Sequence, residues 1–214
     1  MIINRNISTQ VVDHLRKEII LGRYQEGEPL VETSVSKELG VSRGPVREAI
    51  SKLSSENLIE KFSNGRNAVV GFELEDIRNL YDTRILLENH ALSQITEASY
   101  SEAREKLLHF IKQMEEADYY EQRDVETDLA FHHQLVKMSG NKSLRLLWSA
   151  QRDIFRTLID ITSEVTFTNQ PEIINQHIEI VKTLDEGNVE AAQNLLKTHL
   201  SEACDHCCRG KKLI

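Results

Sequence analysis

Four residues in the second half of the chain have the types and spacing of a divalent-metal site. Asp128 and His132 are four positions apart in a stretch with helical periodicity, so a carboxylate and an imidazole share one helix face. His177 and His199 lie in the middle of two later stretches with apolar periodicity. Three imidazoles and one carboxylate from facing helices could hold Zn²⁺, Ni²⁺ or Mn²⁺ and leave a coordination position open. The alternative is that each histidine is a hydrogen-bonded core or surface residue.

The cysteines gather near the end of the chain, at Cys204, Cys207 and Cys208. They cannot form a disulfide framework that spreads through the fold, so a reducing cytoplasm fits. With His206 they could bind soft metals, but no partner cluster accompanies them, and we expect solvated or half-buried thiols. The first residues lack the apolar core of a signal peptide, and no apolar run is long enough for a membrane helix. We therefore expect a cytoplasmic protein with no membrane partner.

A second group of residues, in the first third of the chain, has the chemistry of nucleic-acid contact. Arg43 and Arg47 share one face of a predicted helix, which Ser42 is placed to cap and which has Pro45 in its first turn. The arginines could contact guanine edges or phosphates, and Ser42 with the first N–H groups could hold a phosphate. Arg66, in a predicted turn, suits the minor groove or the DNA backbone. The alternative is that the arginines form surface salt bridges, with Glu48 as a neighbour of Arg47.

The elements that must carry these arginines form a winged helix-turn-helix. Residues 8–22 predict a supporting helix, and two short helical patterns within Glu32–Glu56 meet at Gly40, where the chain must turn sharply. Two strand-like runs, Leu58–Phe62 and Ala68–Phe72, then flank a Ser-Asn-Gly-Arg turn and predict the wing.

From Glu73 onward the apolar spacing is helical throughout. Six helices are predicted, at Leu74–Ala98, Ser101–Tyr120, Arg123–Ser139, Lys142–Thr162, Glu172–Glu186 and Val189–Cys208. The fold class expected is mainly α, with a winged helix-turn-helix over residues 1–72 and an all-α antiparallel helical bundle over residues 73–214.

The charge of the 214-residue chain is divided unevenly between these two parts. The net charge is −8, but residues 1–72 carry +1 and residues 73–214 carry −9. The overall acidity therefore does not exclude DNA binding by the N-terminal part, provided that its cations gather on one face.

The stretch from Leu39 to Ile50, LGVSRGPVREAI, resembles the G-V-S-R-T-P-V-R-E-A-L signature of the GntR family of bacterial transcription regulators. The six-helix remainder is similar to the FadR-type branch of that family, which has an FCD effector domain. The chain departs from the pattern at two candidate DNA contacts. Thr33 follows Glu32 where the family often has arginine, and Asn67 stands where the wing tip usually has glycine.

This resemblance implies a homodimeric regulator that binds double-stranded operator DNA, and repression relieved by a small organic acid. It also implies that Asp128, His132, His177 and His199 hold a divalent ion, with Zn²⁺ as the first choice and Ni²⁺ or Mn²⁺ as alternatives. Arg84 would help to hold the carboxylate of the effector, whereas its simpler role is an ion pair with Glu88, one helical turn later. Asn89 and Arg152 are further candidate effector contacts.

Other functions stay open at this point. The regulator could respond to metal without an organic effector, and activation in place of repression is not excluded. A metal-dependent hydrolase fused to a DNA-binding module is disfavoured because the chain has no H-E-x-x-H motif, and no glutamate shares the helix face of His177. We expect no enzymatic activity.

Overall fold

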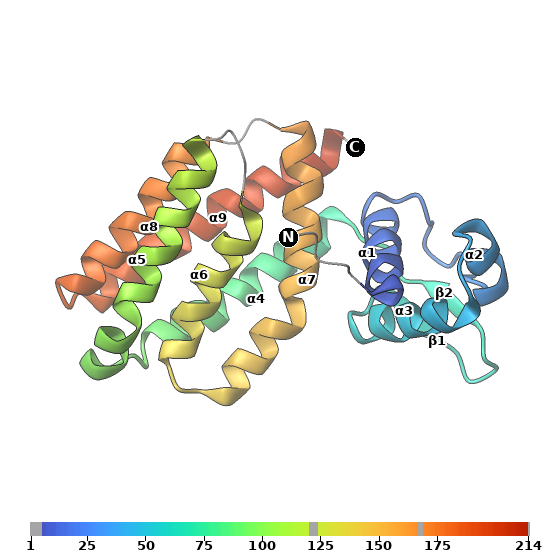
Figure 1. Ribbon diagram of the computed structural model, residues 1–214, viewed down its shortest axis with the longest axis horizontal. Helices are drawn as coiled ribbons and strands as arrows, with labels where there is room; N and C mark the ends of the chain where they lie inside the picture. The colour runs from blue at the N-terminus through green and yellow to red at the C-terminus, as the bar shows by residue number, and fades with distance from the viewer. Residues whose placement is uncertain (1–5, 120–123, 167–168, 214) are drawn as a thin grey trace. The chain divides into compact units, whose positions relative to one another are not determined.

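The computed structural model describes residues 6–119, 124–166 and 169–213. Over these residues the chain is helical apart from two short strands and the connecting turns (Figure 1), which confirms the predicted mainly α fold class. The chain divides into two compact units, one extending to Asp76 and the other covering Ile77–Leu213. The predicted domain boundary, between residues 72 and 73, stays a prediction.

The first unit is a winged helix-turn-helix. Its elements are α1 (Ile7–Ile20), α2 (Glu32–Glu38), α3 (Arg43–Ser55), β1 (Ile59–Lys61) and β2 (Asn67–Val69). Helix α1 packs on α3 through buried residues that include Leu15, Ile19, Val46 and Ile50. Gly40, with φ of 65°, makes the turn between α2 and α3, as predicted.

The wing is a two-stranded antiparallel hairpin that is shorter than predicted. Ile59 pairs with Val69, and Lys61 pairs with Asn67. The left-handed backbone conformation of the turn falls on Gly65, with φ of 81°, so Asn67 sits in the strand without strain.

The second unit contains six described helices, as predicted. They are α4 (Leu74–Leu92), α5 (Glu97–Tyr119), α6 (Val125–Met138), α7 (Lys142–Val165), α8 (Gln170–Asp185) and α9 (Val189–Leu213). Helix α6 packs between α5 and α7, and α8 packs between α5 and α9. The predicted ends at Tyr120 and Arg123 lie outside the described residues.

Helix α9 continues past its predicted end, and this changes the environment of the cysteines. Cys207 and Cys208 are buried and Cys204 is half-buried, so the expectation of solvated or half-buried thiols is wrong for two of them. A thiol packs as a small apolar side chain, and the Cys207 sulfur lies 3.4 Å from the Tyr81 hydroxyl. Burial, followed by the neighbouring Cys208, raises the pKa of Cys204 to about 12.

Close packing of α9 on α7 also depends on a glycine. A Cβ added to Gly210 would lie 2.5 Å from the Cβ of Thr162, closer than real Cβ atoms approach. Glycine therefore allows the two helix backbones to approach each other here.

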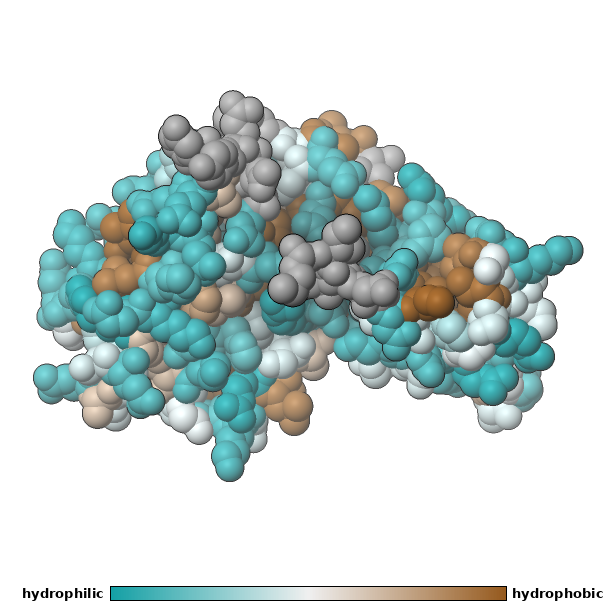
Figure 2. Space-filling model, viewed as in Figure 1, coloured by the Kyte–Doolittle hydropathy of each residue, from teal (hydrophilic) through white to brown (hydrophobic). Residues whose placement is uncertain are grey.

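Most of the surface in view in Figure 2 is hydrophilic, and hydrophobic residues show there only in small separate groups. None of the described helices combines the length and hydropathy needed to span a membrane.

Candidate metal centre and nucleic-acid interface

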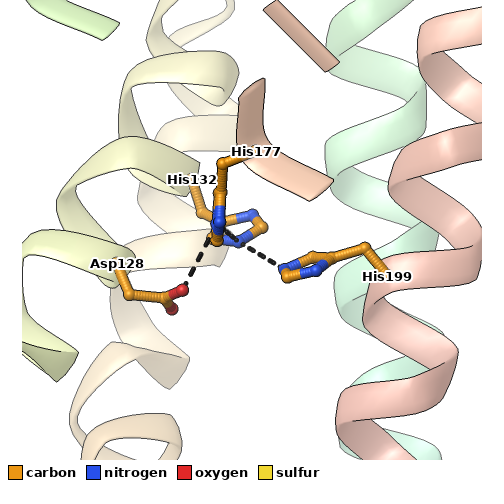
Figure 3. A group of neighbouring side chains, drawn as sticks. All are labelled: Asp128, His132, His177 and His199. Atoms are coloured by element: carbon orange, nitrogen blue, oxygen red, sulfur yellow. Dashed lines mark hydrogen bonds and ion pairs between the residues drawn. The ribbon is translucent and has the colours of Figure 1, made fainter. Parts of the chain in front are cut away.

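The four residues predicted to bind a metal meet between three helices of the second unit. Asp128 and His132 lie on α6, His177 on α8 and His199 on α9 (Figure 3). Each offers one donor atom, and these atoms all lie within 4.8 Å of one another. The three histidines are buried, and the Asp128 side chain is 16% exposed. The structure thus gathers the four residues into one group, which we call the His/Asp cluster.

Hydrogen bonds orient the three imidazoles of the His/Asp cluster. In each ring Nδ1 lies 2.7 Å from an acceptor. For His132 the acceptor is the carboxylate of Glu88, and for His177 it is the main-chain carbonyl of Ile173. For His199 it is the side-chain oxygen of Gln176. Because all three partners accept, we assign the ring proton to Nδ1 in each case. Each Nε2 then has a lone pair available inside the cluster.

The distances between these donor atoms fit a bound cation. Nε2 of His132 lies 3.2 Å from Nε2 of His199 and 3.3 Å from Nε2 of His177. Nε2 of His177 also lies 3.3 Å from Oδ1 of Asp128. Two ligands at ~2.0–2.1 Å from a tetrahedral zinc ion are roughly 3.3–3.4 Å apart. Lone pairs at this separation repel one another unless a cation lies among them. The donor set and its spacing therefore suit Zn²⁺ or a similar divalent ion.

The ionisation of the His/Asp cluster also suits a metal. Burial lowers the pKa of His132 and of His199 below the ordinary value, and for His199 the other two histidines lower it further. Burial raises the pKa of Asp128, but the neighbouring His177 and His132 outweigh this effect and hold it well below its usual range. Neutral imidazole and ionised carboxylate are the forms that bind metals.

A cavity of about 220 Å³ adjoins the His/Asp cluster. Asp128 and His199 line it together with Arg84. The rest of its wall comes from Tyr81, Ile159, Asn169, Glu172, Ile173, Gln176, Leu200, Glu202, Ala203, His206, Cys207 and Arg209. A small polar molecule in this cavity could therefore reach an ion held by the cluster.

Arg84, on α4, presents an unpaired donor at this cavity. Its side chain is 2% exposed, and its Nε donates to Oε1 of Glu88 at 2.7 Å. Its Nη2 is buried and has no hydrogen-bond partner among the described residues. The ion pair with Glu88 and a role in anion binding are thus compatible, because they use different nitrogens of one guanidinium. A buried donor without an acceptor is unfavourable, and a ligand carboxylate would satisfy it.

The other two candidate effector contacts do not belong to the described wall of the cavity. Nη2 of Arg152 donates to Oε2 of Glu126 at 2.5 Å. The main-chain oxygen of Asn89 accepts from Gln193 at 2.8 Å. Neither residue is therefore placed to contact a ligand in this cavity.

Two residues that orient the imidazoles are not identified by the sequence pattern. The spacing of four between Arg84 and Glu88 predicts an ion pair on one helix face and does not indicate a contact between Glu88 and a histidine. Gln176, next to His177, carries no recognisable pattern. Both accept a hydrogen bond from an imidazole Nδ1, so the cluster depends on more than its four candidate ligands.

In the first unit, a surface groove gathers most of the predicted DNA contacts. It is lined by Thr33 from α2, Arg43 and Arg47 from α3, and Arg66 and Asn67 from the wing. Three arginines on one groove provide the local positive charge that phosphate contact requires.

Glu32 lies between the two arginines of α3. Its Oε2 is 3.2 Å from Nη2 of Arg43 and 3.1 Å from Nη2 of Arg47. The hydrogen bond from Arg47 is the largest influence that lowers the pKa of Glu32. The surface ion pairs considered for the arginines therefore exist, but with Glu32 in place of Glu48, which accepts from Ser8 instead. The arginine side chains are 58% and 67% exposed, so both remain accessible.

Ser42 occupies the N-cap position of α3, but its side chain makes no capping hydrogen bond. The predicted side-chain cap is therefore wrong. The backbone has the extended conformation of a cap residue, but Pro45, the third helical residue, has no N–H for the side chain to accept from. Pro45 lies in the first turn, as predicted. The N–H of Gly44, the group that a side-chain cap would satisfy here, is left available to a phosphate.

Comparisons with known proteins cover both units. The model of the bacterial regulatory proteins of the gntR family matches residues 7–69, and that of the FCD domain matches residues 79–202. The gluconate operon transcriptional repressor of Bacillus subtilis (strain 168) is 26% identical over 185 residues, 82% of this chain and 76% of that protein. A GntR transcriptional regulator of known structure from Rhodococcus sp. RHA1 is 27% identical, with a TM-score of 0.62 over 94% of this chain and 96% of its own. The solved metal-free FCD domain of another regulator is 19% identical and similar in fold, with a TM-score of 0.54 over 65% of this chain and 96% of its own.

Proposed function

The chain belongs to the gntR family of bacterial regulatory proteins and carries an FCD domain, and we propose that it is a transcriptional repressor that a small carboxylate releases from operator DNA. One observation carries the effector part of this proposal. Asp128 and His199 of the His/Asp cluster line the same cavity as Arg84, whose Nη2 has no partner among the described residues. A metal ion and a guanidinium side by side are a strong recognition site for a carboxylate.

The residues that hold the metal in this proposal are Asp128, His132, His177 and His199. Zn²⁺ is the first choice because three imidazoles and one carboxylate form a ligand set that zinc accepts, while Ni²⁺ and Mn²⁺ remain alternatives. The ion supplies attraction for a carboxylate oxygen of the effector. Arg84 donates to the same carboxylate and fixes its orientation.

The polar groups of the cavity wall suit a carboxylate that carries hydroxyl groups. Arg84, Arg209 and a divalent ion would attract the ligand carboxylate, whereas Asp128, Glu172 and Glu202 on the same wall disfavour a ligand with several negative charges. The amides of Asn169 and Gln176 could bond to ligand hydroxyls. Gluconate has this chemistry, and the similar Bacillus subtilis repressor is named for a gluconate operon, so gluconate is the first compound to test.

DNA binding in this proposal uses the groove of the first unit. Arg43 and Arg47 contact base edges or phosphates in the major groove, Arg66 and Asn67 of the wing contact the neighbouring backbone, and Thr33 takes a peripheral phosphate. Two chains in a homodimer would place two α3 helices on a near-palindromic operator. The effector releases DNA if it binds more tightly to the dimer arrangement that does not fit the operator.

The test combines ligand binding with DNA binding. An operator is first selected from random duplexes with the purified full chain. Gluconate and related acids are then screened by thermal shift, with and without Zn²⁺, because a ligand of the folded state raises the melting temperature. A compound that stabilises the protein only with Zn²⁺, and also releases the operator, supports the proposal.

Three other results would contradict it. If the compound raises the melting temperature by the same amount after chelation, effector binding does not need the metal. Release of DNA by metal alone would favour a metal-responsive regulator without an organic effector. Chemical conversion of the compound, abolished by His177→Ala, would favour the hydrolase alternative.

A further inference from the structure

Glu88 joins three side chains of the second unit through one buried carboxylate. Its Oε2 lies 2.7 Å from Nδ1 of His132. Its Oε1 accepts from Nε of Arg84 and from Nε1 of Trp148, each at 2.7 Å. The side chain is 0% exposed, so no water competes for these bonds at its surface. The carboxylate therefore connects α4 with α6 and α7.

We propose that Glu88 positions His132 for metal binding, an inference that rests on the proposed metal site. An imidazole ligates a metal well when its second nitrogen is held by an acceptor, which fixes the ring and increases its basicity. His177 and His199 use neutral acceptors, a carbonyl and an amide oxygen. His132 alone among the three has a charged acceptor, and a carboxylate makes the stronger bond.

The other oxygen of Glu88 keeps the carboxylate in place for this task. Two donors, one from Arg84 and one from Trp148, converge on Oε1, so the carboxylate plane cannot rotate without breaking both bonds. Arg84 is held by Glu88 through Nε, and its guanidinium carbon lies 4.7 Å from the ring centroid of Phe155, while its Nη2 has no partner among the described residues. One residue therefore orients both a metal ligand and the arginine of the effector cavity.

Trp148 offers a direct readout of this arrangement. It is the only tryptophan in the chain. Its indole N–H is bonded to Glu88, and its ring stacks on His133 with centroids 5.1 Å apart and planes at 9°. A cation on His132 draws Glu88 toward that ring, and this changes the bond to the indole. We expect Zn²⁺ binding to alter the intrinsic fluorescence of the full chain.

The experiment compares Zn²⁺ affinity in three full-length proteins by competition with a chromophoric chelator. Glu88→Gln keeps the size of the side chain but removes its charge, and it should weaken Zn²⁺ binding about 10–100-fold. The matched control is Asp185→Asn, which also removes a carboxylate that pairs with an arginine, Arg104, at 2.6 Å. Asp185 is not part of the cavity wall, so Zn²⁺ affinity should be unchanged. In Trp148→Phe the fluorescence change on Zn²⁺ binding should be lost, which would assign the change to the indole of Trp148.

Two outcomes overturn the inference while leaving the proposed metal site intact. One is equal Zn²⁺ affinity in the wild type and Glu88→Gln. The other is a Glu88→Gln protein that melts at a lower temperature but binds Zn²⁺ normally, which shows a purely structural role. If Glu88→Gln does not fold by circular dichroism, Glu88→Asp replaces it, with weaker Zn²⁺ binding expected because the shorter side chain cannot reach His132 as well. A wild-type protein that binds no Zn²⁺ refutes both the metal site and this inference.

Discussion

Nε2 of His132 lies 3.2 Å from Nε2 of His199, and the two rings stack with planes at 13° although they come from different helices. Removal of both imidazoles, as His132→Ala with His199→Ala, should abolish metal binding, because half of the proposed ligands are lost. Elemental analysis of the purified protein measures this. The control is His133→Ala, which removes a histidine that faces Trp148, and this variant should keep its metal. Metal retained by the double variant would refute the assigned ligands.

Arg47→Ala should weaken operator binding by about 1–3 kcal/mol if Arg47 reads a base. Fluorescence anisotropy with the selected operator measures the loss. Arg23→Ala is the matched control, because Arg23 is an equally exposed arginine of the first unit that pairs with a glutamate, Glu18, and is not part of the groove. Equal operator affinities for the two variants would show that Arg47 does not contact the operator.

Glu32→Gln should strengthen binding to DNA of unrelated sequence. In the free protein the Glu32 carboxylate neutralises Arg43 and Arg47, and phosphate must displace it. The amide releases both arginines, so the salt dependence of binding should become steeper as further phosphate contacts form. Titrations with a random duplex at several salt concentrations give the slope. An unchanged slope would contradict this, because it would show that release of the two arginines adds no phosphate contact.

Acidification should destabilise the metal-free protein. Burial holds the pKa of His199 well below the ordinary 6.5, so near pH 6 the unfolded chain takes up a proton that the folded chain does not. The stability due to the neutral ring is fully present above that ordinary value and is lost as the pH falls below it. Melting temperatures of chelator-treated protein between about pH 7.5 and about pH 5.5 measure the loss. His199→Gln should show a smaller decrease over this range, and an identical decrease would contradict the assignment.

Gly210→Ala should destabilise the second unit by about 1–3 kcal/mol, since its new methyl group would overlap Thr162 on α7. Gly44→Ala is the comparison, because a Cβ at Gly44 meets nothing within 4 Å in helix α3. That variant should be neutral or more stable by about 0.4–1 kcal/mol, as the unfolded chain loses freedom. Denaturant unfolding, followed by circular dichroism, distinguishes the two. A stable Gly210→Ala protein would mean that α9 can move away from α7.

Most of the fold follows from local patterns in the sequence. Helical periodicity identifies the six helices of the second unit, and Gly40 marks the turn between α2 and α3. The ends of the helices are less well determined. Helix α9 passes beyond Cys208, and near its end Tyr81 and Thr162 contact Cys207 while Thr162 lies against Gly210. A sequence pattern cannot show which neighbours cover a helix end.

The candidate ligands can be identified by residue type and spacing, whereas their hydrogen-bond partners cannot. Asp128 and His132 are related by a helical repeat, which sequence displays directly. Gln176 meets His199 only because α8 packs on α9, and Glu32 meets Arg47 only because α2 turns back on α3. Such contacts depend on tertiary packing, which a single sequence does not encode as a pattern.

The order of the ligands along the chain has a consequence for biosynthesis. Asp128 and His132 leave the ribosome early in the second unit, whereas His199 arrives on α9, after every other helix described here. The complete set of donors cannot form until α9 has emerged and packed against α7 and α8. A nascent or prematurely terminated chain would thus present an incomplete ligand set, and loading with metal would mark chains in which the whole bundle has assembled.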